Sequence, residues 1–582
     1  MKSGLRLLSL FCALVLSSVN AFSLDREAFT FTNYDLTAQI DPAQQRLGMR
    51  GKITLRNDSQ GPQKIAVLQI TSSLDWRSIK FAGKPLQYVT QPYTSDIDHT
   101  GALSEAIVTL PAPVPPKGTV ELEIGYEGII TLDATRLKRI GAPETEANSS
   151  DWDQISEKFT GLRGAGYVAW YPIATEVADL SESNSMFDVL ERWKMRESAS
   201  KIHLTVDISM DIFIVNGSEL PKVFFIGVLC PATMSEHQHE VVDCAIQPSR
   251  LDTPTLVIAD YKIIERQYVE VRYLLGHDVA ATNFADSAGK IAPFITEWFG
   301  PQREKAKTAD LPVAAATPFE SGTLLLTPFA NPDFKLGGLS AAHQLTHAAF
   351  LSFRPWIEEG LAHFAQALYL EQDKGRKTAL EYMGQHRASL GNAETSTAIP
   401  RSEDEANHSL VNTTSEELYR SKAMYVWWML RDMVGDAALK KALAAYKPED
   451  DKEPSYMPRL VQAQTQRDLE WFFDDWVYRD RGLPEFKVES AFSRKTMNDT
   501  YMLTITVDNL GAAGAEVPIA IKYTGGEVTK RLEVRGKNKG VFRVEVSGEP
   551  QEAAVNDGSV PESNLTNNIF KIEPPATPSK LP

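Results

Sequence analysis

Cysteine is scarce in this sequence of 582 residues, which contains three. Cys12 lies in an apolar stretch near the N-terminus, so only Cys230 and Cys244 remain beyond that stretch. An isolated pair of this kind has two interpretations, a disulfide that closes a short loop or part of a metal site. An oxidising compartment favours the disulfide, and we predict a Cys230–Cys244 bond.

Long apolar runs are also missing after the N-terminus. Residues 1–21, MKSGLRLLSLFCALVLSSVNA, carry two basic residues, then an apolar run, then a small-residue site ending at Ala21. This order is typical of a secretory signal peptide, and the run is too short to span a bilayer. No later stretch reaches about 18 uninterrupted apolar residues, the length that a membrane-spanning helix needs. We therefore expect a secreted or periplasmic protein with no integral membrane segment after signal removal.

Basic residues are fewer than acidic ones, 60 against 76. The formal net charge is −16, and removing Lys2 and Arg6 with the signal, which contains no acidic residue, takes it to −18. A strongly acidic surface argues against nucleic acid or anionic lipid as a partner. The hydrophobic content of 43% and charged content of 23% are those of a globular protein, and the length predicts two to four domains.

The residue patterns predict a multidomain α+β protein. Apolar and polar residues alternate in YDLTAQI and GKITLRN, and FFIGVL and QYVEVRYLL are predicted as further strands. These patterns predict a β-rich domain over residues 22–277. Helical apolar spacing then dominates residues 278–484, for example in LSAAHQLTHAAFLSF, SEELYRSKAMYVWWMLRDMVG and DLEWFFDDWVYRDRGLPEF. Strand patterns return in residues 485–575, which suit a small β-sandwich, and residues 576–582 form a Pro-rich tail.

Two histidines and a glutamate in the helical region have metal-ligand spacing. His343 and His347 are four residues apart, so on a helix they lie on one face and can converge on one tetrahedral cation. Pro355 separates this helix from the next, which begins Trp-Ile-Glu-Glu-Gly, and a third ligand would lie near that start. Glu359 is a better candidate than Glu358, and the two point about 100° apart, so both are not expected to be ligands.

One acidic residue is missing from this pattern. Zinc peptidases usually read His-Glu-x-x-His, whereas residues 343–347 read HQLTH and place Gln344 in the second position. The glutamate of such enzymes accepts the proton of the attacking water, and a neutral amide cannot. General-base catalysis contributes about 10²–10⁴ in rate, so its loss costs roughly 3–5 kcal/mol of transition-state stabilisation.

The surrounding sequence resembles the catalytic domain of the M1-type aminopeptidases and related gluzincin (peptidase MA-like) families. The likeness is carried, in the family's order, by APFITEWFG, TPFESGTLLL, HQLTH with WIEEGLAHF, YRSKAMYVWWMLRDMVGD and FFDDWVYRDRGLPEFKV, all within residues 291–488. The resemblance implies an N-terminal β-sandwich like the N-domain of these enzymes. It also implies a thermolysin-like, mainly α catalytic domain and an Ig-like C-terminal β-sandwich.

The same resemblance implies roles for individual residues. His343, His347 and Glu359 are expected to bind Zn²⁺, and Tyr419 to donate a hydrogen bond to the oxyanion on the scissile carbonyl. Glu320 is expected to bind the substrate amino group. Two alternatives stay open, because Glu320 beside Gly322 is also typical of a turn and Tyr419 of a packed helical aromatic residue.

The sequence departs from the family in more than Gln344. The link of eleven residues between His347 and Glu359 is shorter than in the M1 enzymes, and TPFESG lacks their Met-Glu-Asn order. Tyr419 is followed by Arg-Ser-Lys-Ala, so its register is uncertain by one position, and the family's large C-terminal helical domain is missing. Two functions remain open: an exported zinc metallopeptidase of aminopeptidase type, impaired by Gln344, or a catalytically inactive zinc-binding relative that binds peptides or a protein partner.

Overall fold

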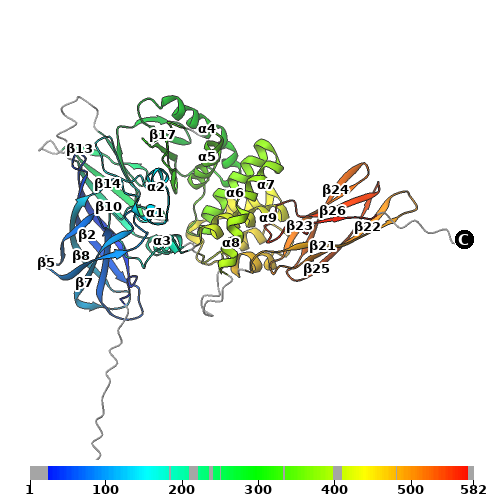
Figure 1. The fold of residues 1–582 in the computed structure, drawn as a ribbon, viewed down its shortest axis with the longest axis horizontal. Helices are drawn as coiled ribbons and strands as arrows, with labels where there is room; N and C mark the ends of the chain where they lie inside the picture. Colours follow the sequence, from blue (N-terminus) through cyan, green and yellow to red (C-terminus); the bar gives the residue numbers. More distant parts are fainter. Residues whose placement is uncertain are drawn as a thin grey trace, which may run out of the picture.

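The computed structural model describes residues 24–573 apart from 183–184, 209–220, 235–239, 249–250, 332–333, 398–408, 414 and 480. The expected signal peptide and Pro-rich tail lie outside these residues. Figure 1 shows three regions in chain order, with sheets at the left, a helical region in the middle and further sheets at the right. The sheet-rich N-terminal region and the helical middle region are as the sequence predicts.

The described residues of the N-terminal region form three sheets. Their strand orders are β13-β14-β10-β1-β2-β8-β4-β5, β3-β7-β6 and β12-β11-β15-β9. The strands are β1 (Phe29–Asp41), β2 (Arg46–Asn57), β3 (Gln63–Thr71), β4 (Leu74–Phe81), β5 (Lys84–Pro85), β6 (Gln87–Thr94), β7 (Ala102–Val114), β8 (Thr119–Ile129), β9 (Phe159–Leu162), β10 (Lys201–Ile208), β11 (Lys222–Phe225), β12 (Val228–Leu229), β13 (Ala232–Met234), β14 (Glu240–Pro248) and β15 (Leu256–Ala259).

Helices α1 (Thr135–Arg139), α2 (Glu144–Ser150) and α3 (Ser185–Glu197) interrupt these strands. The first two lie between β8 and β9, and α3 lies between β9 and β10. The alternation of apolar and polar residues explains why the sheet segments form strands with one buried face. In β1, Leu36, Ala38 and Ile40 are buried, whereas Gln39 is exposed. The structure joins Cys230 and Cys244 with an S–S distance of 2.01 Å.

The prediction of one continuous strand over FFIGVL is wrong. β11 ends at Phe225, and the chain reverses through Ile226 and Gly227 before β12 pairs back onto β11. Both turn residues have positive φ, 45° and 69°, as the tight hairpin turn with two left-handed positions requires. Isoleucine rarely adopts such a backbone, so Gly227 alone marks the turn in the sequence.

The middle region combines one sheet with a set of helices. The sheet has the order β16-β17-β18-β20-β19. Its strands are β16 (Lys262–Glu265), β17 (Val269–Tyr273), β18 (Ala306–Asp310), β19 (Phe319–Ser321) and β20 (Leu324–Thr327). The helices are α4 (Asp278–Phe299), α5 (Phe334–Ala349), α6 (Pro355–Lys374), α7 (Arg376–Gln385), α8 (Arg387–Thr397), the π-helical η1 (Glu417–Lys422), α9 (Ala423–Val434), α10 (Asp436–Ala445), the 3-10 turn η2 (Pro448–Asp450), α11 (Tyr456–Gln462), α12 (Glu470–Phe473) and the π-helical η3 (Asp474–Tyr478).

This sheet positions the candidate site. β17, β18 and β20 are parallel, whereas β19 runs antiparallel to β20 at the edge. The sheet also spans the predicted domain boundary, because β16 and β17 precede residue 278 and pair into it. α4 packs against both α5 and β17, and α5 packs against α6, so the sheet, α5 and α6 form successive layers.

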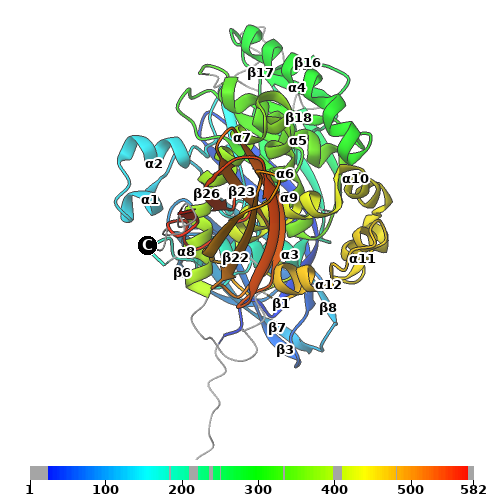
Figure 2. The ribbon, with the colours of Figure 1, turned by 90° about the vertical axis from the view of Figure 1, so that its right-hand side faces the viewer.

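The C-terminal region consists of two sheets, β21-β22-β25 and β24-β23-β26-β27. Figure 2 shows these sheets in front of the helices when the molecule is viewed from this end. Their buried residues are continuous with the core of the helical region. The strands are β21 (Phe486–Lys495), β22 (Tyr501–Asn509), β23 (Ala515–Tyr523), β24 (Gly526–Val534), β25 (Lys539–Val546), β26 (Pro550–Val555) and β27 (Ile569–Lys571).

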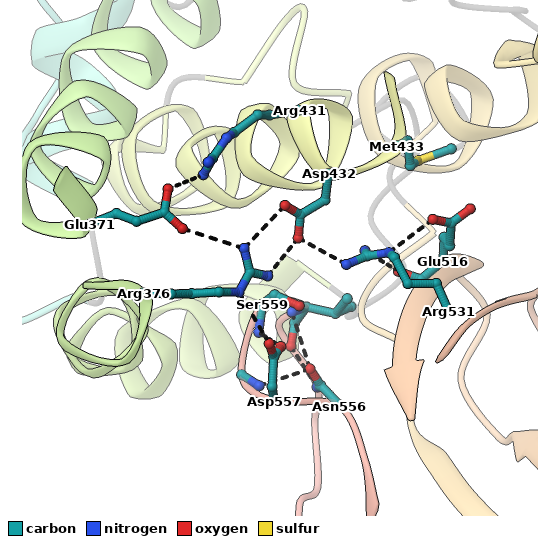
Figure 3. A network of polar contacts seen from close by, with 12 residues as sticks. Glu371, Arg376, Arg431, Asp432, Met433, Glu516, Arg531, Asn556, Asp557 and Ser559 are labelled. Atoms are coloured by element: carbon teal, nitrogen blue, oxygen red, sulfur yellow. Dashed lines mark hydrogen bonds and ion pairs between the residues drawn. The ribbon is translucent and has the colours of Figure 1, made fainter. Parts of the chain in front are cut away.

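Ion pairs join the helices to the C-terminal sheets. Asp432 on α9 accepts hydrogen bonds from Arg376 on α7 at 2.7 Å and from Arg531 on β24 at 3.1 Å. Arg531 also donates to Glu516 on β23 at 2.9 Å, and Arg376 donates to Asp557 at 3.3 Å (Figure 3). Among the described residues, no helix is long and apolar enough to cross a membrane.

Candidate metal centre

Helix α5 brings the two predicted histidine ligands together. His343 and His347 are 2% and 6% exposed, and their Nε2 atoms lie 3.0 Å apart. The one-turn spacing places both rings on the same face of the helix, as the sequence predicts. Two ring nitrogens that face each other at this distance are suitably placed to share one cation.

Helix α6 supplies the carboxylate. Glu359 lies with one oxygen 3.7 Å from His343 Nε2 and the other 3.7 Å from His347 Nε2. The three ligand atoms lie within 4.8 Å of one another. Gly360 lets α6 approach α9 closely, because a Cβ at this position would lie 2.6 Å from the Ala423 Cβ.

This donor set fits zinc. Two imidazole nitrogens and one carboxylate are three ligands of the kind that catalytic zinc sites use, with a fourth position left for another molecule. Glu359 Oε2 is buried and makes no hydrogen bond, although the Arg420 Nε lies 3.2 Å away. A cation between the two helices would satisfy this oxygen and the two facing nitrogens together.

The neighbouring Glu358 has a different role from Glu359. Its Oε1 lies 3.2 Å from His347 Nδ1, and its Oε2 accepts the backbone N–H of Ser352. Adjacent helical residues point about 100° apart, which explains why one glutamate faces the two Nε2 atoms and the other lies behind His347. A carboxylate behind a histidine fixes the ring and directs its other nitrogen at a metal.

Burial and charge set opposite pKa shifts on the two histidines. Burial lowers the pKa of His343 to about 3, with the neighbouring His347 acting in the same direction. Burial also acts to lower the pKa of His347, but its bond to Glu358 and the charge of Glu359 raise it to about 9. Burial opposes ionisation of Glu359, yet Arg420 and His347 hold the pKa of this carboxyl well below its usual value.

Glu320 lies at the edge of the ligand group. It is on the edge strand β19, and its Oε2 is 3.6 Å from His343 Nε2, with 32% of the side chain exposed. Burial, with the nearby Glu359, raises the pKa of Glu320, although Arg420 acts in the opposite direction. Glu320 is outside the group of three close ligand atoms.

Gln344 and Tyr419 are both buried and engaged by other parts of the chain. Gln344 is 1% exposed, and the end of its amide that faces the carbonyl oxygens of Gly322 and Thr323 is assigned as the nitrogen, because only the nitrogen can donate to them. Tyr419 lies in η1, 2% exposed, and its hydroxyl is hydrogen-bonded to Glu191 on α3 of the N-terminal region. Burial raises the pKa of Tyr419 well above its ordinary value, with the charge of Glu191 acting in the same direction.

Sequence reasoning missed two residues that contact site residues, Arg420 and Glu191. Arg420, next to Tyr419, reaches Glu359, and its signal in the sequence is the departure from the family pattern at this point. Glu191 comes from a helix far away in the chain and has no local signal. His363, four residues after Glu359, has its ring 5.1 Å from the ring of His343.

A small cavity opens beside these groups. Its volume is about 50 Å³, and its lining includes His347, Glu358, Glu359, Gly322 and Asp252. Such a volume holds a few water molecules. Asp252 belongs to the segment that follows β14, so the N-terminal region forms one wall of the cavity.

Solved structures with a similar fold are M1 zinc metallopeptidases. A two-domain M1 zinc metallopeptidase variant bound to L-tryptophan aligns with a TM-score of 0.51 and 17% identity, covering 79% of this chain and 96% of that chain. A variant of the M1 zinc metallopeptidase from Deinococcus radiodurans bound to a Tyr-Ser-Ala substrate aligns with a TM-score of 0.50 and 16% identity, with the same coverage. At these identities the similarity shows the fold. No family model matches the sequence, and no curated protein matches it.

Proposed function

We propose that this chain is an exported zinc metallopeptidase of aminopeptidase type whose hydrolysis of peptides is impaired by Gln344. The observation that carries the proposal is the group formed by His343, His347 and Glu359, on two adjacent helices of a fold shared with M1 zinc metallopeptidases. These three residues would hold the zinc ion. When bound, zinc polarises a carbonyl oxygen and lowers the pKa of a water molecule.

Other residues around the three ligands have supporting roles. Glu358 orients His347, and Arg420 holds the pKa of Glu359 low so that this side chain stays an anion. Gln344 cannot accept a proton, and both oxygens of Glu358 are engaged. Glu320 is the most exposed of the three carboxylates beside the histidine pair, so the proposal assigns it the proton of the attacking water or the amino group of the peptide.

A second candidate function is peptide binding without turnover. Gln344 provides no base, and the Tyr419 hydroxyl is already bonded to the Glu191 carboxylate. Both observations favour a cleft that retains the metal ligands while lacking two groups that hydrolysis uses. In this version the chain binds the end of a peptide or a protein partner and releases it unchanged.

Export is part of the proposal. The N-terminal signal pattern and the Cys230–Cys244 bond both support an oxidising compartment outside the cytoplasm. The acidic net charge of −16 suits a peptide or protein ligand better than nucleic acid.

The test is hydrolysis of a mixed peptide pool by zinc-loaded protein, read by mass spectrometry of new termini. The impaired peptidase predicts slow cleavage that a chelator abolishes and that His343→Ala lacks. Binding of the pool without new termini would support the second candidate instead. Turnover at ordinary enzyme rates, of order 1–10³ per second, would contradict the impairment. A protein that binds no zinc would overturn both.

A further inference from the structure

The turn that follows Glu320 is two residues long and tightly constrained. Ser321 pairs with Leu324 at the end of the β19–β20 hairpin, so Gly322 and Thr323 form the turn. Gly322 has a φ of 52° at the first turn position, where a two-residue hairpin of this kind requires glycine. Any movement of this turn therefore moves Glu320, two residues before it.

Gln344 contacts this turn from helix α5. With the amide assigned so that its nitrogen faces the carbonyl oxygens, the nitrogen lies 2.8 Å from the Gly322 oxygen and 3.3 Å from that of Thr323. The Gln344 side chain is also hydrogen-bonded to Glu320 itself. The Thr323 oxygen also accepts the backbone N–H of Lys307 at 2.8 Å, which joins the turn to β18. An amide that donates twice to backbone carbonyls is a strong local anchor because the Gln344 side chain itself is buried.

A glutamate could not make these contacts. An ionised carboxylate only accepts hydrogen bonds, so in place of the Gln344 amide it would face two carbonyl oxygens with no donor between them. The residue that occupies the position of the missing base is thus suited to a different task. It donates to the edge-strand turn rather than accepting a proton.

We propose that Gln344 is a positioning residue, which holds the Gly322–Thr323 turn and thereby fixes Glu320 beside His343. The turn has a second anchor on the side of the N-terminal region. Thr253 donates its backbone N–H to the Ser321 hydroxyl at 3.0 Å, and a Cβ on Gly322 would lie 2.2 Å from Asp252 Oδ1. Ser321 and Gln344 together set the distance of 3.6 Å between Glu320 Oε2 and His343 Nε2.

For Gln344→Glu we expect a less ordered site, although this change restores the acidic residue of zinc peptidases. Restoring the acidic residue of zinc peptidases removes the two donated hydrogen bonds, so the turn loosens and Glu320 moves. The variant therefore gains a carboxylate but loses the geometry of the edge strand. The contact between Gln344 and the turn arranges the site whether or not the cleft hydrolyses peptides.

The first experiment is hydrogen exchange of the whole protein, without substrate, for the native chain, Gln344→Met and Gln344→Glu. Both variants should increase exchange in peptides covering residues 319–326 by about tenfold relative to the rest of the chain. The matched control is Gln366→Met, because Gln366 is also a buried glutamine, donating to Leu339 O at 3.2 Å, but it does not touch the turn. Native-like exchange of residues 319–326 in Gln344→Glu would overturn the proposal.

The second experiment tests the connection to Glu320 through Co²⁺ binding, followed by visible absorption. Gln344→Met should change Co²⁺ affinity by about fivefold in the native background and by less than about twofold when Glu320 is already replaced in Glu320→Gln. Equal effects in both backgrounds would show that Gln344 acts on the fold alone and would overturn its positioning role. If Gln344→Met does not fold, Ser321→Ala removes the other anchor and must loosen the same segment, and an unchanged segment would also overturn the proposal.

Discussion

Glu358 lies behind His347, with its Oε1 3.2 Å from the ring Nδ1, and its other oxygen accepts the Ser352 backbone N–H. The backbone bond holds the carboxylate in place, and the carboxylate holds the imidazole. His347 Nε2 is thereby directed at His343 and Glu359. Ring orientation in the candidate centre thus depends on a residue that is not one of the three ligands.

Replacing this carboxylate should weaken metal binding. We expect Glu358→Gln to lower Zn²⁺ affinity by about 10–100-fold, because the amide cannot hold the imidazole as the carboxylate does. Competition with a chromophoric chelator measures the change. Glu304→Gln is the control, since Glu304 lines the same cavity and pairs with Lys307 at 2.8 Å. Native affinity in Glu358→Gln would show that the ring is fixed by other contacts.

Glu320 is the residue on which residual hydrolysis should depend. If the zinc-loaded chain cleaves peptides slowly, Glu320→Gln should reduce the rate by about 10²–10⁴, because the variant removes the partly exposed carboxylate beside His343. Initial rates on one peptide identified from the pool provide the measurement. A rate within twofold of native, with zinc still bound, would exclude Glu320 from the reaction.

The sequence predicts the parts of the site that depend on local spacing. His343 and His347 need only one helical turn, and Glu359 follows from a short link to the next helix. Gln344 is evident as a departure from a known pattern, but its contact with Gly322 depends on where β19 packs. Likewise, nothing local to Tyr419 indicates Glu191, which comes from a helix more than 200 residues earlier.

In the fold, too, local residue patterns predict some features, whereas tertiary packing determines others. Alternation and helical spacing report which faces are buried, so they locate the sheet-rich and helical regions. They do not report the π-helical turn of η1, in which Tyr419 and Arg420 lie, because its register depends on packing against α6 and α8. The hairpin at Ile226 was missed for a related reason, since tertiary contacts hold isoleucine at a φ of 45°.

The ion pairs at the C-terminal junction should contribute to stability. Asp432 has 9% of its side chain exposed and pairs with both Arg376 and Arg531 (Figure 3). We expect Asp432→Asn to lower the free energy of unfolding by about 2 kcal/mol, because it weakens two charge-assisted hydrogen bonds at once. Urea denaturation measures this loss.

An exposed pair on the next helix provides the control for this change. Asp436→Asn breaks a contact to Arg431 in which Asp436 is 51% exposed, and should cost less than about 1 kcal/mol. Equal losses in the two variants would mean that burial of Asp432 adds nothing to the junction.

A buried acid in the N-terminal region should make stability depend on pH. Burial raises the pKa of Glu197 from 4.5 to about 7, although Arg196 and the Tyr34 hydroxyl act in the opposite direction. Between these values the folded chain keeps a proton that the unfolded chain has released. Stability contributed by this group is therefore present below pH 4.5 and is lost as the pH rises to about 7.

The variant Glu197→Gln should remove this dependence, because a glutamine carries no charge to bury. Its amide can accept from the Phe31 backbone and donate to the Tyr34 oxygen, whose own hydroxyl donates to Pro172 O at 3.1 Å. At pH 8 we expect the variant to be up to about 3 kcal/mol more stable than the native chain, and most of this difference should disappear at pH 5. Urea denaturation at the two pH values, followed by tryptophan fluorescence, measures it. A difference that is the same at both pH values would mean that Glu197 is not protonated in the folded chain, and that Tyr34 and Arg196 hold it as an anion.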